Sequence, residues 1–164
     1  MSAAFDAMTA MELRARIARR EVSPVEVTRR ALDKAEATPG SLNAFFILMP
    51  EKALAAAKAA EDAVMRGDAL GPLHGVPFSA KDLIAVGGER FAFGSRCMAD
   101  NIAAADAPSV ERAKKAGAIL IGKTTTSEFG CKGVGDSPLT GRTRNRSDEH
   151  TAAPPSVTRH VCRS

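Results

Sequence analysis

The order of apolar runs and helical patterns in the middle of the chain most constrains the fold. Residues 76–84 form an apolar run, residues 108–116 have the pattern of a helix, and residues 118–122 form a second apolar run. A strand, a helix and another strand in this order indicate a crossover connection between parallel strands. The sequence therefore predicts an α/β fold in which helices flank a mixed, partly parallel sheet.

Helices are also expected before this unit. Residues 8–20 carry apolar residues at helical spacing. A second helix is expected to begin at Ser23, an N-cap residue with Glu26 in the capping-box position. Residues 43–49 are expected to form a strand, and residues 50–66 an alanine-rich helix.

Composition narrows the class of protein. The 164 residues have a formal net charge of +4 and contain no Trp or Tyr. The low aromatic content of 4% argues against a stacking surface for single-stranded nucleic acid. The basic segment from Lys132 onward is interpreted as solvated, because no nucleic-acid recognition motif accompanies it. No leader pattern and no membrane-length apolar run is found, which favours a cytoplasmic protein. The widely spaced cysteines are interpreted as free thiols: Cys97, Cys131 and Cys162.

One lysine stands out within the first apolar run. Lys81 has apolar neighbours in the sequence: Phe78, Ala80, Leu83 and Ile84. A charged side chain costs free energy when it leaves water without a partner, and a desolvated lysine can lose its proton and act as a base. The alternative is a structural surface pair between Lys81 and Asp82 at a strand end. Composition and spacing alone favour this alternative.

Three segments, in order, resemble the amidase signature family. They are residues 71–77 followed by Lys81 and Asp82, residues 107–124, and residues 128–145. The likeness covers the chain from about residue 8 to residue 145, and it implies the first part of the family's fold. This family hydrolyses or transfers amides with a Ser–cis-Ser–Lys triad. The resemblance therefore implies that Lys81 is the catalytic lysine, with no cofactor and no metal.

Two further signals do not indicate a site. His74 belongs to a structural loop by the same resemblance, so we predict a loop or core role for it rather than a role as base. Residues 117–124 fit the phosphate-loop pattern G-x-x-x-x-G-K-[ST]. The middle of this match is an apolar strand whose backbone amides would be used in a sheet, which argues against phosphate binding.

The resemblance also implies two sequence features of the family that are not found among these residues. The family's Gly/Ser-rich signature should follow soon after Asn145 and the nucleophilic serine later still, and neither is found. We therefore expect residues 1–145 to be the N-terminal portion of an amidase domain, and residues 146–164 a divergent, disordered tail. A frameshift near residues 145–151 is one explanation. Codons for residues 152–162, read one base earlier, can spell Gly-Gly-Ser-Ser-x-Gly-x-Ala-Ala-x-Val, which resembles the missing signature.

Two kinds of function stay open at this point. The first is hydrolysis of a small-molecule amide, or glutamine-dependent tRNA transamidation by a related amidotransferase chain that works with partner subunits. The second is a non-catalytic fragment or interaction protein, because the covalent step needs a serine. We expect an amidase-type chain that is inactive at this length. A sheet cut short would also expose a strand edge and an apolar face, which favours aggregation or a homo-oligomer.

Overall fold

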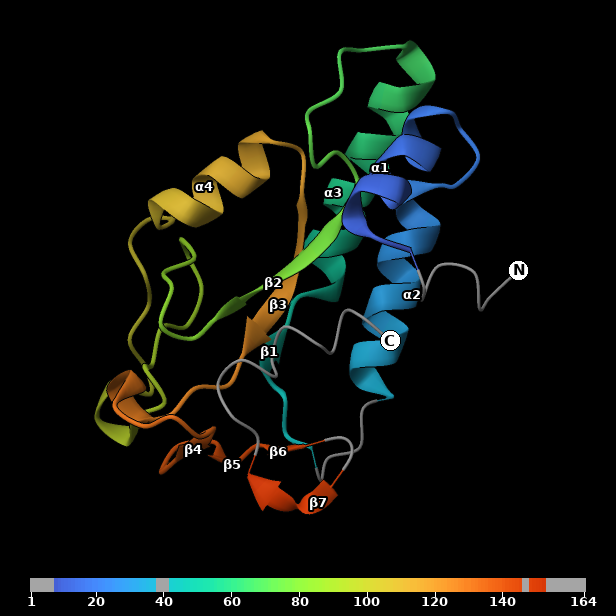
Figure 1. Cartoon of the computed structure of the whole chain (residues 1–164). Coiled ribbons are helices and arrows are strands. Elements are labelled where there is room, and N and C mark those ends of the chain that lie inside the picture. The colour runs from blue at the N-terminus through green and yellow to red at the C-terminus, as the bar shows by residue number, and fades with distance from the viewer. Residues whose placement is uncertain (1–7, 38–41, 146–147, 153–164) are drawn as a thin grey trace.

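The computed structural model describes residues 8–37, 42–145 and 148–152. Four α-helices and a three-stranded sheet form the main body of these ranges (Figure 1). The helices are α1 (Ala10–Ala18), α2 (Pro24–Glu36), α3 (Pro50–Arg66) and α4 (Pro108–Lys115). The strands of the sheet are β1 (Phe45–Leu48), β2 (Pro77–Lys81) and β3 (Ile119–Thr124).

The sheet is mixed, as the sequence predicted. The strand order is β1-β3-β2, with β2 parallel to β3 and β1 antiparallel to it. Helix α4 makes the crossover between the two parallel strands. The strand β3 is buried at every residue, while β1 and β2 are the outer strands of the described sheet. The α/β fold class is therefore confirmed.

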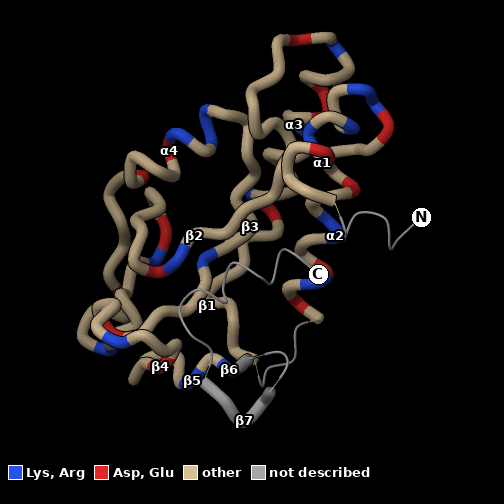
Figure 2. Tube along the Cα trace, in the orientation of Figure 1, with Lys and Arg blue, Asp and Glu red and all other residues tan. Residues whose placement is uncertain are grey.

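Helices cover both faces of the sheet (Figure 1). On one face, Ile119 and Ile121 of β3 pack against α2 and α3 through Leu32, Ala53 and Ala57. On the other face, Leu120 packs with a second cluster that includes Val110 of α4. Charged residues of both signs are interleaved along the helices and loops, whereas most of the three strands is uncharged (Figure 2). Burial of these two apolar faces holds the layers together.

Two helices begin with different side-chain caps. At α1, Thr9 and Glu12 form a complete capping box that was not predicted. At α2, the predicted N-cap Ser23 accepts hydrogen bonds from the backbone N–H groups of Val25 and Glu26. The Ser23 hydroxyl donates to Glu61 of α3, so this cap also joins α2 to α3.

The chain after β3 forms loops with short strands. A single turn at Glu128–Gly130 is followed by the hairpin of β4 (Asp136–Ser137) and β5 (Gly141–Arg142). The strand β6 (Arg144–Asn145) pairs with β7 (Asp148–Ala152). Strand β7 therefore lies within the segment expected to be disordered, whereas residues 146–147 and 153–164 lie outside the described residues.

None of the helices in the described ranges is long and apolar enough to cross a membrane.

Candidate active site

The carboxyl ends of β2 and β3 bring two lysines to the same edge of the sheet. In the parallel register, Ala80 lies beside Lys123 and Lys81 lies beside Thr124. Residues paired in register share a face of the sheet, and successive residues alternate between faces. Lys81 and Lys123 therefore project from opposite faces, although their strands are neighbours.

Lys81 is half-buried and its backbone is fixed. The N–H of Asp82 donates to the Thr124 carbonyl at 3.0 Å, and the N–H of Ile84 donates to the Lys81 carbonyl at 2.8 Å. Within the described residues, the Lys81 ammonium has no hydrogen bond and no ion pair. Burial lowers the pKa of Lys81 below its usual value. The desolvated setting expected from its apolar neighbours is present, and its catalytic role stays a prediction.

The surface pair between Lys81 and Asp82, which was the alternative, is wrong. The Asp82 carboxylate is buried and lies 2.6 Å from the Nζ of Lys123, whose side chain is 0% exposed. Asp82 turns away from Lys81 because neighbouring residues at a strand end point to different sides. The aspartate and the buried lysine thus form an ion pair inside the protein.

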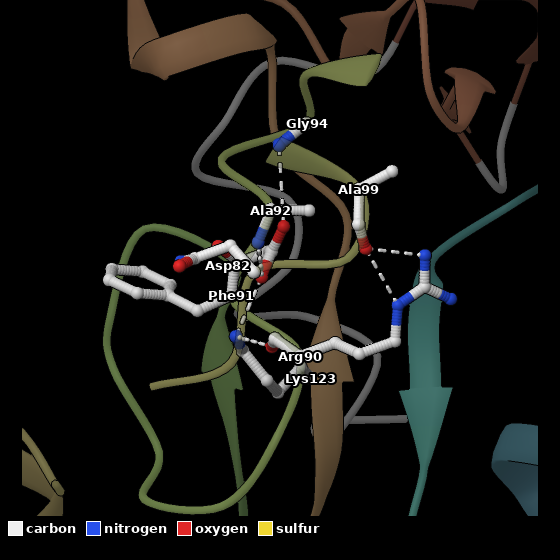
Figure 3. Close-up of polar contacts among 8 residues, drawn as sticks. Asp82, Arg90, Phe91, Ala92, Gly94, Ala99 and Lys123 are labelled. Carbon is white, nitrogen blue, oxygen red and sulfur yellow. Dashed lines mark hydrogen bonds and ion pairs between the residues drawn. The ribbon is translucent and has the colours of Figure 1, made fainter. Parts of the chain in front are cut away.

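This ion pair holds the loop that follows β2 (Figure 3). The two Asp82 carboxylate oxygens accept the backbone N–H groups of Ala92 and Gly94, each at 3.3 Å. The Lys123 ammonium donates to the Arg90 carbonyl at 2.5 Å and lies 4.9 Å from the centre of the Phe91 ring. Among the described residues, the charged groups of this pair therefore hydrogen-bond only to each other and to the loop.

Arg90 extends the network toward the rest of the sheet. Its guanidinium donates two hydrogen bonds to the Ala99 carbonyl, at 3.0 and 2.7 Å (Figure 3). The same group lies 5.1 Å from the centre of the Phe46 ring in β1. The loop thus contacts both β3 and β1, and its position is tied to the sheet.

Two bulky residues near the pair have left-handed backbone conformations. Phe93 has φ 53° and Phe129 has φ 49°. The Phe129 N–H donates to the Phe93 carbonyl at 2.8 Å, and the two rings stack with centres 5.9 Å apart. Such conformations are costly for large side chains and persist only where the surroundings hold them. The loop around Phe93 is therefore a constrained part of the edge.

The two signals that were set aside have structural roles. The ring of His74 donates from Nε2 to the Ala60 carbonyl of α3 at 2.9 Å, and the backbone of this loop is bonded to the turn before β3. The predicted structural role of His74 is confirmed. Residues 119–124 use their backbone in the sheet with β1 and β2, so the argument against a phosphate loop is confirmed as well.

The buried serines beyond the strand ends have partners other than Lys81. The Ser95 hydroxyl donates to Glu128 at 2.8 Å, and the Ser127 hydroxyl donates to the Lys132 carbonyl at 3.1 Å. The described ranges contain no group of His, Cys, Asp and Glu that could hold a metal ion. Cys97 and Cys131 are free and exposed, and Cys162 lies outside the described residues.

The role of Lys123 was missed in the sequence. The sequence pattern places Lys123 only in a phosphate-loop match, and it indicates Asp82 only as a surface partner of Lys81. A signal was present, because Lys123 directly continues an apolar run and a buried lysine needs a counter-charge. With parallel strands predicted, Asp82 lies at the matching end of the neighbouring strand and is a candidate for that counter-charge.

Comparison with known proteins gives one consistent family. The sequence profile of the family called Amidase matches residues 26–153 and so extends past Asn145, the predicted end of the resemblance. One chain of a glutamyl-tRNA(Gln) amidotransferase from Geobacter sulfurreducens is 39% identical over 138 residues, covering 84% of this chain and 28% of the relative. An acylamidase from Rhodococcus erythropolis is 39% identical, covering 84% of this chain and 29% of the relative.

Solved structures agree with the sequence relatives. A bacterial aryl acylamidase of the amidase signature enzymes superposes with a TM-score of 0.86 at 28% identity, over 92% of this chain and 32% of that one. A vestigial protein complex, described as revealing the origins of an s-triazine catabolic enzyme, gives 0.87 at 34% identity, over 92% and 33%. The chain thus spans about a third or less of the length of these proteins.

Proposed function

The chain belongs to the Amidase family, and on that premise we propose that Lys81 is the base of an amide-hydrolysing active site. The observation that carries the proposal is a lysine that is half-buried and lacks a counter-charge among the described residues, at the carboxyl end of a parallel strand. Ligand sites of α/β sheets lie beyond this end of the strands. The match of Lys81 to the family's catalytic lysine agrees with this position.

The chemistry follows from the proton state of the lysine. A serine hydroxyl is a weak nucleophile and needs a base to take its proton. In the family's triad this proton passes to a neutral lysine through a bridging serine. Burial favours the neutral amine of Lys81, because it disfavours the charged form. Backbone N–H groups of a glycine-rich loop would then stabilise the negative oxygen of the intermediate.

We propose further that these 164 residues alone do not hydrolyse amides. The family's two serines match no position of this sequence, and the hydroxyls of Ser95 and Ser127 are engaged by other groups. Without a serine beside Lys81, no acyl group can be transferred to the protein. The alternative function, a non-catalytic fragment or interaction protein, is favoured by the same observations.

An ammonia-release assay separates the two functions. The purified chain and its Lys81→Ala variant are incubated with indoleacetamide, a primary benzamide and glutamine, all of which release ammonia on hydrolysis. We expect no ammonia from either protein above the buffer rate. Turnover that is lost in Lys81→Ala would contradict the proposed inactivity and assign a complete enzyme to this chain.

The proton state of Lys81 can be tested without turnover. Only neutral amines react with a trace of acetic anhydride, and peptide mass spectrometry reports each lysine separately over a pH series. We expect Lys81 to react at lower pH than the exposed Lys132, whose side chain is 60% exposed. Lys123 should stay unlabelled and so report that the chain is folded. If Lys81 titrated like Lys132, its role as base would be contradicted.

A part of an amidotransferase is the second candidate within the enzyme class. It is favoured by the relative from Geobacter sulfurreducens, which is part of a glutamyl-tRNA(Gln) amidotransferase. Its identity to this chain equals that of the acylamidase, so identity does not separate a tRNA-linked role from a small-amide role. Glutamine as the reactive substrate in the assay above, with partner subunits present, would indicate the amidotransferase.

We also propose that a frameshift near residues 145–151 replaced the family's own continuation of the chain. Support comes from the shifted frame of residues 152–162, which can spell a Gly/Ser-rich segment like that of the family. Sequencing of the coding DNA tests this directly, because a shifted frame without that segment would contradict the proposal.

A cytoplasmic location is proposed as well, and it is supported by the exposed free thiols of Cys97 and Cys131.

A further inference from the structure

We infer that the buried ion pair of Asp82 and Lys123 is a positioning element for Lys81. It holds the loop of residues 82–94 on the ends of β2 and β3, and it keeps the Asp82 carboxylate away from the Lys81 amine. This inference rests on the proposed function, because it gives the pair a task in preparing the base.

The first step of the argument concerns charge. A carboxylate next to a lysine favours the protonated ammonium and would weaken it as a base. Here the Asp82 carboxylate is neutralised by Lys123 at 2.6 Å, on the opposite face from Lys81. Burial alone lowers the pKa of Lys81, and no charged side chain of the described residues contributes. Because Asp82 is paired with Lys123, it does not serve as a counter-charge for Lys81, its neighbour in the sequence.

The second step concerns the loop. The Asp82 carboxylate receives the N–H groups of Ala92 and Gly94, the two residues that flank the left-handed Phe93. Lys123 holds the preceding part of the same loop through the Arg90 carbonyl. A strained turn persists only where several contacts fix it. The pair therefore connects the strand end at Lys81, the strand β3 and the strained loop in one network (Figure 3).

The third step separates this role from general stability. A buried ion pair seldom adds net stability over apolar side chains of similar volume. An apolar pair could fill the space between β2 and the loop, but it could not accept two loop N–H groups or donate to the Arg90 carbonyl. What this pair supplies beyond packing is directed hydrogen bonds next to the base.

The test is the pH profile of Lys81 labelling in the full 164-residue chain. Lys123→Met leaves Asp82 without its partner and removes the hydrogen bond from Lys123 to the Arg90 carbonyl of the loop. We expect the Lys81 profile to move to higher pH, because the amine gains water and an uncompensated neighbouring carboxylate. At a fixed neutral pH, labelling of Lys81 falls roughly tenfold for each unit by which its pKa rises. Lys115→Met, at an exposed ion pair with Glu111, should leave the profile unchanged.

A second variant guards against loss of the fold. Asp82→Asn with Lys123→Gln removes both charges but keeps hydrogen-bonding groups at both positions. It should fold and restore a Lys81 profile close to that of the unaltered chain. An unchanged Lys81 profile in a folded Lys123→Met would overturn the inference and leave the proposed function standing. Loss of the fold in both variants would also overturn it, since the pair would then serve the whole fold. If Lys81 of the unaltered chain reacted over the same pH range as the exposed Lys132, the proposed function itself would be contradicted.

Discussion

Two lysines at the ends of neighbouring strands have opposite environments. Lys123 is fully buried, yet it is paired with Asp82, bonded to the Arg90 carbonyl and placed over the Phe91 ring. Lys81 is less buried and has no such partner among the described residues. The more buried lysine is the one whose charge is compensated. Burial alone therefore does not identify a base, and the absence of a counter-charge is the more informative property.

The largest loss of stability is expected at Lys123, whose charge is compensated by Asp82. Lys123→Met should lower the free energy of unfolding by about 3–5 kcal/mol, because the buried Asp82 loses its partner. Urea unfolding followed by circular dichroism measures the change. The matched control Lys115→Met removes an exposed pair and should cost no more than about 1 kcal/mol. Similar losses in the two variants would show that the buried pair is not special.

The architecture could be predicted from the sequence because local patterns encode it, namely the spacing of apolar residues and the positions of Pro and Gly. The helix α3 was predicted at its observed bounds, since Pro50 begins it and Gly67, with φ 78°, ends it in the left-handed conformation. The parallel pairing of β2 and β3 followed from the intervening helix. These features depend on residues close in the chain.

The site was predicted only in part because its contacts join distant residues. Lys81 was found from its apolar neighbours and from the resemblance. The partner of Asp82 is 41 positions away, and which face each side chain takes depends on the register of β2 with β3. A bulge between Phe78 and Ser79 changes that register, and nothing in the local pattern reveals it.

The next-largest loss of stability is expected at Gly122, which precedes Lys123 in β3 and lies against β1. A methyl group on Gly122 would meet the Ile47 carbonyl oxygen at 2.5 Å, which is backbone of the paired strand β1. Gly122→Ala should therefore lower the free energy of unfolding by about 1–3 kcal/mol, measured by urea unfolding. Gly133→Ala is the matched control, because no atom lies within 4 Å of the added methyl group. Equal stability of the two variants would contradict the close approach of β1 and β3.

A double-mutant cycle measures how far the compensated lysine depends on its partner. Asp82→Asn, Lys123→Met and the double variant are unfolded in urea under the same conditions. Since the two side chains are in contact, the double variant should be more stable than the sum of the single losses predicts, by about 0.5–3 kcal/mol. Strict additivity would show that the two residues act independently, and the comparison of the two lysines would lose its physical basis.

The smallest effect is expected at the lysine without a partner. Lys81→Met breaks no ion pair among the described residues, so near neutral pH it should change the free energy of unfolding less than the variants above do. The lowered pKa of Lys81 means that the unfolded chain holds this proton more tightly than the folded chain. The cost of keeping the ammonium folded is therefore fully present below the folded pKa. Above the folded pKa, Lys81 gives up its proton when the chain folds. The cost then falls as pH rises, and it disappears once the pH exceeds the ordinary pKa of lysine.

The difference in stability between Lys81→Met and the unaltered chain should accordingly shift with pH in one direction. Relative to the unaltered chain, the variant is favoured most at the lower pH values, and this advantage declines as alkaline pH removes the charge from Lys81. Any constant offset reports the packing of the methionine side chain. Lys132→Met, at an exposed position, should show no such trend. A trend of the opposite sign would mean that the folded chain stabilises the Lys81 ammonium, which a base prepared by desolvation cannot do.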